Sequence, residues 1–148
     1  MIDYEAAIVN RGNWSAIQAV FQKAGRGEPV LIGFLGGSIT QGSLASCPEN
    51  CYAARVYQWW KTQFPSVRFI NAGIGGTTSQ FGVARVEEDL LRYRPDLVFV
   101  EFSVNDDCTP FFQETYEGLV RKILSAGIAL MLIHNVRYDN MESAEDVH

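Results

Sequence analysis

The feature that most constrains the fold of this chain is a regular alternation of short apolar runs with longer segments of helical periodicity. The short runs are expected to be strands, at residues 30–35, 67–72, 97–102 and 128–136. The helical segments lie at residues 52–64, 81–93 and 111–126, after a first helix that begins behind Asn13 and ends near Gly25. The run at 30–35 is almost wholly apolar, which is typical of a strand buried on both faces. The alternation predicts an α/β fold, a three-layer α/β/α sandwich with a parallel sheet.

Bulk composition narrows the class of partner. The 148 residues are 47% hydrophobic and 20% charged, as expected of one compact domain spanning residues 1–148. The formal net charge is −5 without a basic run, so neither nucleic acid nor an anionic membrane is an expected partner. No segment is apolar for long enough to span a bilayer. A small-molecule or oligosaccharide substrate of low charge fits better, and the oligomeric state stays open.

The cysteines and the first ten residues bear on the compartment. Cys47, Cys51 and Cys108 are odd in number and lack paired metal-type spacing, which favours free thiols in a reducing environment. Residues 1–10 have no basic start followed by an apolar run, unlike a signal peptide. We therefore expect a cytoplasmic protein. Thiol chemistry at Cys47 and Cys51 is a less favoured alternative.

Three loops that follow predicted strands carry the candidate chemistry. In an open parallel sheet, ligands bind beyond the carboxyl ends of the strands. The loops read GGSIT at 36–40, NAGIGGT at 71–77 and SVND at 103–106. Ser38 is the candidate nucleophile, while the Ser38 and Gly76 amides and the Asn105 side chain are candidate donors to an oxyanion. Each loop alone is more often an ordinary turn or cap, so the hypothesis depends on their convergence.

These blocks resemble those of the SGNH, or GDSL-like, hydrolase family. The resemblance implies a flavodoxin-like fold, Ser38 as nucleophile, an oxyanion hole of Ser38, Gly76 and Asn105, and ester hydrolysis that needs no cofactor. Two positions depart from the common pattern: Gly37 stands where the family often has Asp, and residues 103–104 replace a Gly-rich pair. Both variants are similar to carbohydrate-esterase-like branches, which implies acetyl or other short acyl esters, on carbohydrates.

The fourth block of the family, Asp-x-x-His, has no good match. The chain has two histidines, His134 at a predicted strand end and His148 after the residues EDV. Neither has the expected setting, and we favour neither as the general base. The expectation is therefore a C-terminally truncated hydrolase domain that lacks the last strand and helix, with the histidine and aspartate partners beyond residue 148.

Competing interpretations use the same crevice. One is a noncatalytic carbohydrate- or nucleotide-binding module, or an inactive SGNH-like module, although the Rossmann glycine spacing and the Walker lysine are missing. The Gly-x-Ser-x-Gly elbow of α/β-hydrolases is absent because Thr40 occupies the last glycine position. No long apolar lid follows the site loops, which disfavours a lipase. Four aromatic residues could stack on sugar rings, although helical spacing is more typical of core: Tyr52, Trp59, Trp60 and Phe81.

Overall fold

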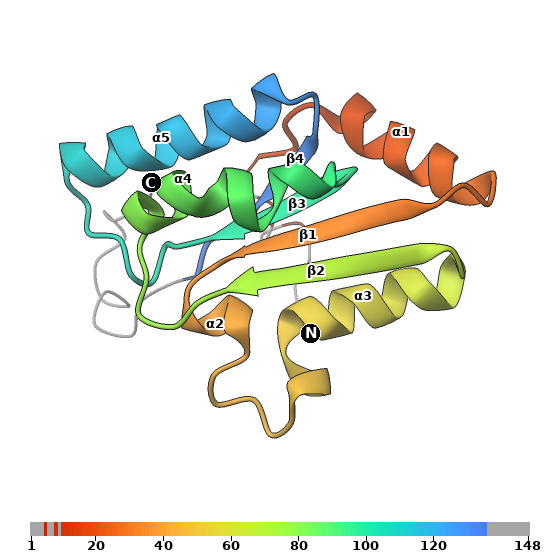
Figure 1. Cartoon of the computed structure of the whole chain (residues 1–148), viewed down its shortest axis with the longest axis horizontal. Coiled ribbons are helices and arrows are strands. Elements are labelled where there is room, and N and C mark those ends of the chain that lie inside the picture. Colours follow the sequence, from red (N-terminus) through yellow and green to blue (C-terminus); the bar gives the residue numbers. More distant parts are fainter. Residues whose placement is uncertain (1–4, 6–7, 9, 136–148) are drawn as a thin grey trace.

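The computed structural model describes residues 5, 8 and 10–135 and contains, within them, a four-stranded parallel sheet (Figure 1). The strands are β1 (Val30–Gly36), β2 (Val67–Gly73), β3 (Leu97–Glu101) and β4 (Ala129–Leu132). The α-helices are α1 (Trp14–Gly25), α2 (Ser38–Gln41), α3 (Tyr52–Gln63), α4 (Ser79–Asp89) and α5 (Pro110–Ser125). Short 3₁₀ turns are η1 (Pro48–Asn50) and η2 (Leu91–Tyr93). The strand order β2-β1-β3-β4 is that of flavodoxin-like doubly wound sheets.

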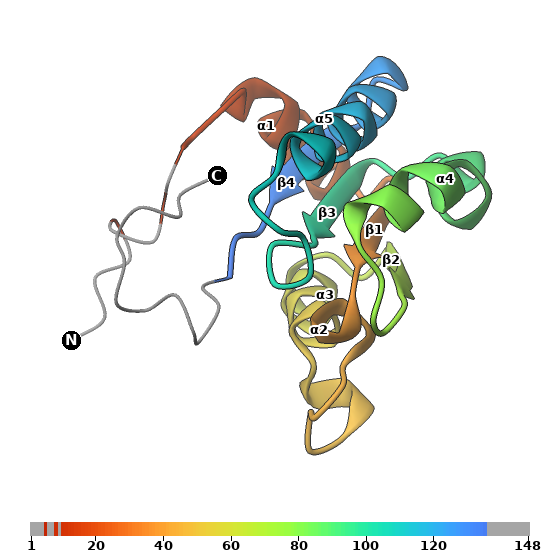
Figure 2. The same ribbon diagram turned by 90° about the vertical axis from the view of Figure 1, so that its left-hand side faces the viewer.

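Helices cover both faces of the sheet, so the predicted three-layer sandwich is confirmed. Helices α1 and α3 lie on one face and α4 and α5 on the other (Figure 2). The core on the first face includes Ile17, Phe34 and Trp60. The core on the second face includes Val98, Phe102 and Leu119. Every residue of β3 is buried, as expected for an inner strand of such a sheet.

Local sequence signals explain several helix boundaries. The Asn13 side chain accepts a hydrogen bond from the Ser15 N–H at 3.2 Å, so the predicted N-cap of α1 is confirmed. Gly27 then takes a positive φ of 77° and turns the chain towards β1. Pro110 opens α5, where a missing N–H costs no helical hydrogen bond. None of the helices in these described segments is both long and apolar enough to cross a membrane.

Two elements of the structure are clearly shorter at their C-terminal ends than the sequence predicts. The helix expected at 81–93 is α-helical only to Asp89, because Leu90 leaves helical geometry with a φ of −140° and is fully buried. The strand expected at 128–136 is paired with β3 only over Ala129–Leu132, and position 136 lies outside the described residues. Tertiary packing rather than local propensity decides both ends.

Gly73 is a point of close approach between β2 and α2. A β-carbon at this position would lie closer than 3.0 Å to the backbone of Thr40 and Gln41. We expect Gly73→Ala to push α2 away from β2 and to lower the free energy of unfolding by about 1–3 kcal/mol. Urea denaturation would measure the loss. Gly25→Ala is the matched control, since its β-carbon would meet no atom within 4 Å; equal losses for both variants would contradict the packing argument.

Candidate active site

The three candidate loops start at the same level because of strand register. Gly36, the last residue of β1, pairs with Gly73 at the end of β2 and with Glu101 at the end of β3. The chain therefore leaves all three strands side by side at their carboxyl edge. This is also where the strand order reverses around β1, the usual position of a ligand crevice in an open α/β sheet.

Hydrogen bonds tie the first loop to the second. The Ile74 N–H donates to the Gly36 carbonyl at 3.0 Å. The Asn71 side-chain amide donates to the Thr40 carbonyl at 2.8 Å, and the Gly75 N–H donates to Gln41 Oε1 at 2.8 Å. The segment that carries Ser38 is thus fixed against the glycine-rich segment 73–76.

The third loop is fixed to both of the others. The Gly37 N–H donates to the Glu101 carbonyl at 3.3 Å, and the Asn105 side-chain amide donates to the Thr77 carbonyl at 2.7 Å. A β-carbon on Gly37 would lie 2.9 Å from Asn105 Nδ2. Position 37 is one where this chain departs from the common family pattern. The glycine there, directly before Ser38, leaves room for the Asn105 amide.

Ser38 is the first residue of α2 and is half-buried. Its backbone N–H has no intrahelical acceptor, as at the start of any helix. Its hydroxyl makes no hydrogen bond with any residue in the described part of the chain. A β-carbon on Gly75 would lie 3.8 Å from the Ser38 β-carbon, so the second loop passes directly beside the serine.

Gly76 and Asn105 present donors from the neighbouring loops. Gly76 has a φ of 71°, a conformation that favours glycine, and a β-carbon there would face open space. The structure shows no acceptor for its N–H among the residues it describes. Asn105 Nδ2 carries two hydrogens, and Thr77 takes one of them. The structure thus brings together the loops of all three predicted residues; their catalytic roles stay predictions.

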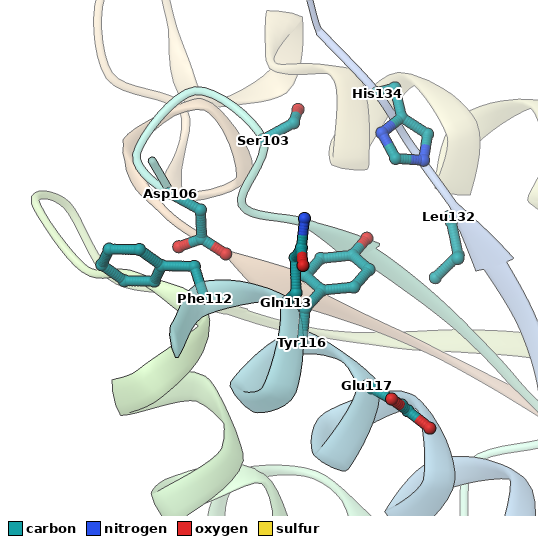
Figure 3. A pocket seen from close by; sticks show the side chains of 8 residues that line it. All are labelled: Ser103, Asp106, Phe112, Gln113, Tyr116, Glu117, Leu132 and His134. Carbon is teal, nitrogen blue, oxygen red and sulfur yellow. The ribbon is translucent and has the colours of Figure 1, made fainter. Parts of the chain in front are cut away.

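The histidines are placed differently from the serine. His134 follows β4 and lines a cavity of about 360 Å³ together with Ser103 and Asp106 (Figure 3). Helix α5 forms the opposite wall of this cavity, and Ser38, Gly76 and Asn105 are not among its lining residues. His148 lies outside the described residues.

Tyr116 contributes a buried phenol to the wall of this cavity. Its hydroxyl is buried and has no hydrogen-bond partner among the described residues. Burial raises the pKa of Tyr116 far above its ordinary value, and the carboxylates of Asp106 and Glu101 raise it further. Tyr52, whose hydroxyl hydrogen-bonds to Thr40 Oγ1 at 2.9 Å, also has a raised pKa, mainly because of burial. Both phenols are therefore neutral at physiological pH.

Several buried polar groups around the loops were not predicted. Glu101 is only 2% exposed and accepts a hydrogen bond from the Ser103 hydroxyl at 3.2 Å. The same hydroxyl accepts from the Asn135 N–H at 2.8 Å, which links the ends of β3 and β4. Asp106 is buried and accepts from the Ser79 N–H at 2.9 Å, which ties the third loop to α4. The one sequence signal for these buried groups was Glu101, a single charged residue at the end of the apolar run 97–100.

The aromatic and cysteine residues divide between core and surface. Trp60 is a core residue that stacks on Phe21 with ring centroids 4.4 Å apart, and Tyr52 is mostly buried. Trp59 and Phe81 are about half exposed. All three cysteines are free, as predicted, and buried Cys51 caps α3 by accepting from the Ala54 N–H. Across the described residues, no group of three or more His, Cys, Asp or Glu side chains could hold a metal ion.

Comparison with known proteins gives one family and several relatives. The model of the GDSL-like Lipase/Acylhydrolase family matches residues 34–146. An acetylxylan esterase from Geobacillus stearothermophilus is 32% identical, and the match covers 74% of this chain and 61% of that protein. The matched segment therefore spans less than two thirds of the relative's length.

Solved structures agree in fold. A two-domain esterase (CEX) active on acetylated mannans, co-crystallized with mannopentaose, is 59% identical with a TM-score of 0.90; the match covers 95% of this chain and 40% of that one. The acetyl xylan esterase AlAXEase is 28% identical with a TM-score of 0.59, over 70% of this chain and 57% of that one. Both structures share the α/β fold of this chain.

Proposed function

Since this chain belongs to the GDSL-like lipase/acylhydrolase family, we propose that it carries the nucleophile and oxyanion elements of a serine esterase. The observation that carries the proposal is the arrangement around Ser38. Its hydroxyl is unengaged by described residues. Ser38 lies beside Gly75 and follows Gly37, which faces the Asn105 amide, and the three loops are hydrogen-bonded to one another. A nucleophile and preorganised donors at one strand edge suit acyl transfer.

The proposed reaction proceeds through an acyl-enzyme. The Ser38 oxygen attacks the ester carbonyl while a general base takes its proton, and the C=O bond becomes a C–O⁻ oxyanion. The N–H groups of Ser38 and Gly76 and the free N–H of Asn105 stabilise that charge. The oxyanion collapses, the ester C–O bond breaks and the alcohol leaves with a proton. Water then attacks the acyl-serine by the same route and releases the carboxylic acid.

The proposed substrate is an acetylated carbohydrate. The support comes from the relatives, among them an acetylxylan esterase and an esterase active on acetylated mannans. The structure adds an exposed aromatic ring in a suitable place: Phe81 is half exposed in the first turn of α4, directly after the second loop. An exposed aromatic ring so close in sequence to the second loop suits the apolar face of a sugar ring.

Acetate release tests the proposal against a binding-only module. The full-length protein is expected to release acetate from acetylated manno- or xylo-oligosaccharides, and p-nitrophenol from p-nitrophenyl acetate faster than from the octanoate. Free acetate is measured enzymatically and p-nitrophenol by absorbance. Binding of the oligosaccharides without acetate release would contradict the esterase and favour the noncatalytic alternative.

A further inference from the structure

Arg85 is a buried cation directly behind the loop that carries Ser38. Its side chain is 8% exposed. Arg85 lies on the buried face of α4, together with Gly82 and Val86. Its guanidinium donates to the Gly36 carbonyl at 3.3 Å and to the Asp89 carboxylate at 2.8 Å. The Phe81 ring, with its centroid 5.7 Å from the guanidinium carbon, provides a third contact. The guanidinium is therefore held in one orientation.

The acceptor of Arg85 belongs to the peptide unit that joins Gly36 to Gly37. At one end of this unit, the Gly36 carbonyl accepts from both Arg85 and the Ile74 N–H. At the other end, the Gly37 N–H donates to the Glu101 carbonyl at 3.3 Å. Three elements, α4, the second loop and β3, thus clamp the Gly36–Gly37 peptide, which is one peptide unit before the Gly37–Ser38 bond. Two glycines flank it, and their conformational freedom makes such a clamp necessary.

We propose that Arg85 is a positioning residue, which fixes the Gly36–Gly37 peptide so that Ser38 and the Gly75–Gly76 turn keep their reactive alignment. This rests on the proposed esterase function. Hydrogen bonds at both ends of one peptide unit polarise it and strengthen one another. Loss of the guanidinium leaves the Gly36 carbonyl with the Ile74 N–H alone, and both loops gain freedom at the point where they touch.

A purely stabilising role fits these contacts less well. Burying a guanidinium costs solvation free energy, and the Arg85 Nε is buried without a hydrogen-bond partner among the described residues. The Asp89 side chain is 37% exposed, so water can solvate its carboxylate if the cation is removed. Arg85→Met is therefore expected to change the thermal midpoint little while impairing catalysis.

The test compares four variants of the full-length protein with wild type. Arg85→Met is expected to lower kcat for p-nitrophenyl acetate by about 10- to 100-fold at similar KM, since small misalignment of reacting groups has effects of that size. Arg85→Lys keeps one charged donor and should recover part of kcat. Asp89→Asn removes the charge but keeps an oxygen acceptor for the guanidinium and leaves the Gly36 contact, so kcat should stay within about twofold of wild type, because a partly exposed ion pair contributes little. Arg92→Met is the matched control, because Arg92 also pairs with a carboxylate and an aromatic ring but is exposed.

Amide hydrogen exchange provides a readout that does not need ester hydrolysis. In Arg85→Met, protection of the Gly37 and Ile74 amides should fall by about tenfold or more, while amides of β3 keep theirs. The proposal would be overturned if Arg85→Met kept both the kcat and the amide protection of wild type while Ser38→Ala was inactive. A wild-type protein that hydrolyses no ester would refute the proposed function. The exchange data would still test whether Arg85 fixes the Gly36–Gly37 peptide, and unchanged protection in Arg85→Met would refute that claim too.

Discussion

Replacement of Ser38 by alanine is expected to abolish ester hydrolysis, with kcat of the full-length protein reduced by about 10³-fold or more. The reason is chemical: the acyl-enzyme route needs a side-chain oxygen at this position, and alanine has none. The fold should be retained, because the Ser38 hydroxyl makes no hydrogen bond with the described residues and its removal leaves no partner unsatisfied.

The measurement is the initial rate of p-nitrophenyl acetate hydrolysis, with circular dichroism to verify folding. Ser43→Ala is the matched control: Ser43 is exposed five residues further on, and its backbone N–H donates to the Ser38 carbonyl whatever its side chain. Its rate should equal that of wild type. Wild-type activity in Ser38→Ala would exclude Ser38 as nucleophile and with it the proposed mechanism.

Asn105→Ala is expected to have the second largest effect, a fall in kcat of about 10²- to 10³-fold at nearly unchanged KM. The free N–H of the Asn105 amide is proposed to donate to the oxyanion, which exists in the transition state and not in the bound ester. An interaction of that kind appears in kcat rather than in KM. Asn105→Asp should be as severe, since a carboxylate cannot donate and adds a negative charge beside the oxyanion.

Loss of the hydrogen bond from Asn105 to the Thr77 carbonyl has to be separated from loss of the oxyanion donor. The thermal midpoint of each variant reports the first, and kcat reports the second. Asn50→Ala is the control, because Asn50 also makes one side-chain hydrogen bond, to Ser46, in an exposed turn. If Asn105→Ala keeps kcat within about twofold of wild type while Ser38→Ala is inactive, Asn105 is not an oxyanion donor, whereas the role of Ser38 as nucleophile is retained.

The fold was accessible from sequence because its signals are local. Apolar runs such as 30–35 and the helical spacing behind Asn13 each depend on neighbours within one or two turns of chain. Their alternation then limits the topology to right-handed crossovers and a parallel sheet. The main errors, the ends of α4 and β4, occur where packing of Leu90 and pairing with β3 decide the boundary.

The candidate site was only partly accessible. Ser38, Gly76 and Asn105 could be named because each follows a predicted strand, and parallel strands end at one edge of their sheet. The supporting groups were missed. Glu101 and Arg85 are charged residues that a pattern assigns to the surface, yet both are buried. Gly37 was noted as a departure from the family pattern, but its reason, the approach of Asn105, needs the coordinates.

By itself, the sequence determined the α/β class, the order of the elements and the three loops where chemistry could occur. Only the tertiary structure decided that Gly36, Gly73 and Glu101 end in step, that Arg85 reaches the Gly36 carbonyl, and that Ser38 does not line the cavity that contains His134. The physical reason is distance along the chain. Periodicity and capping act between near neighbours, whereas register and burial depend on contacts between segments tens of residues apart, which exist only once the layers have packed.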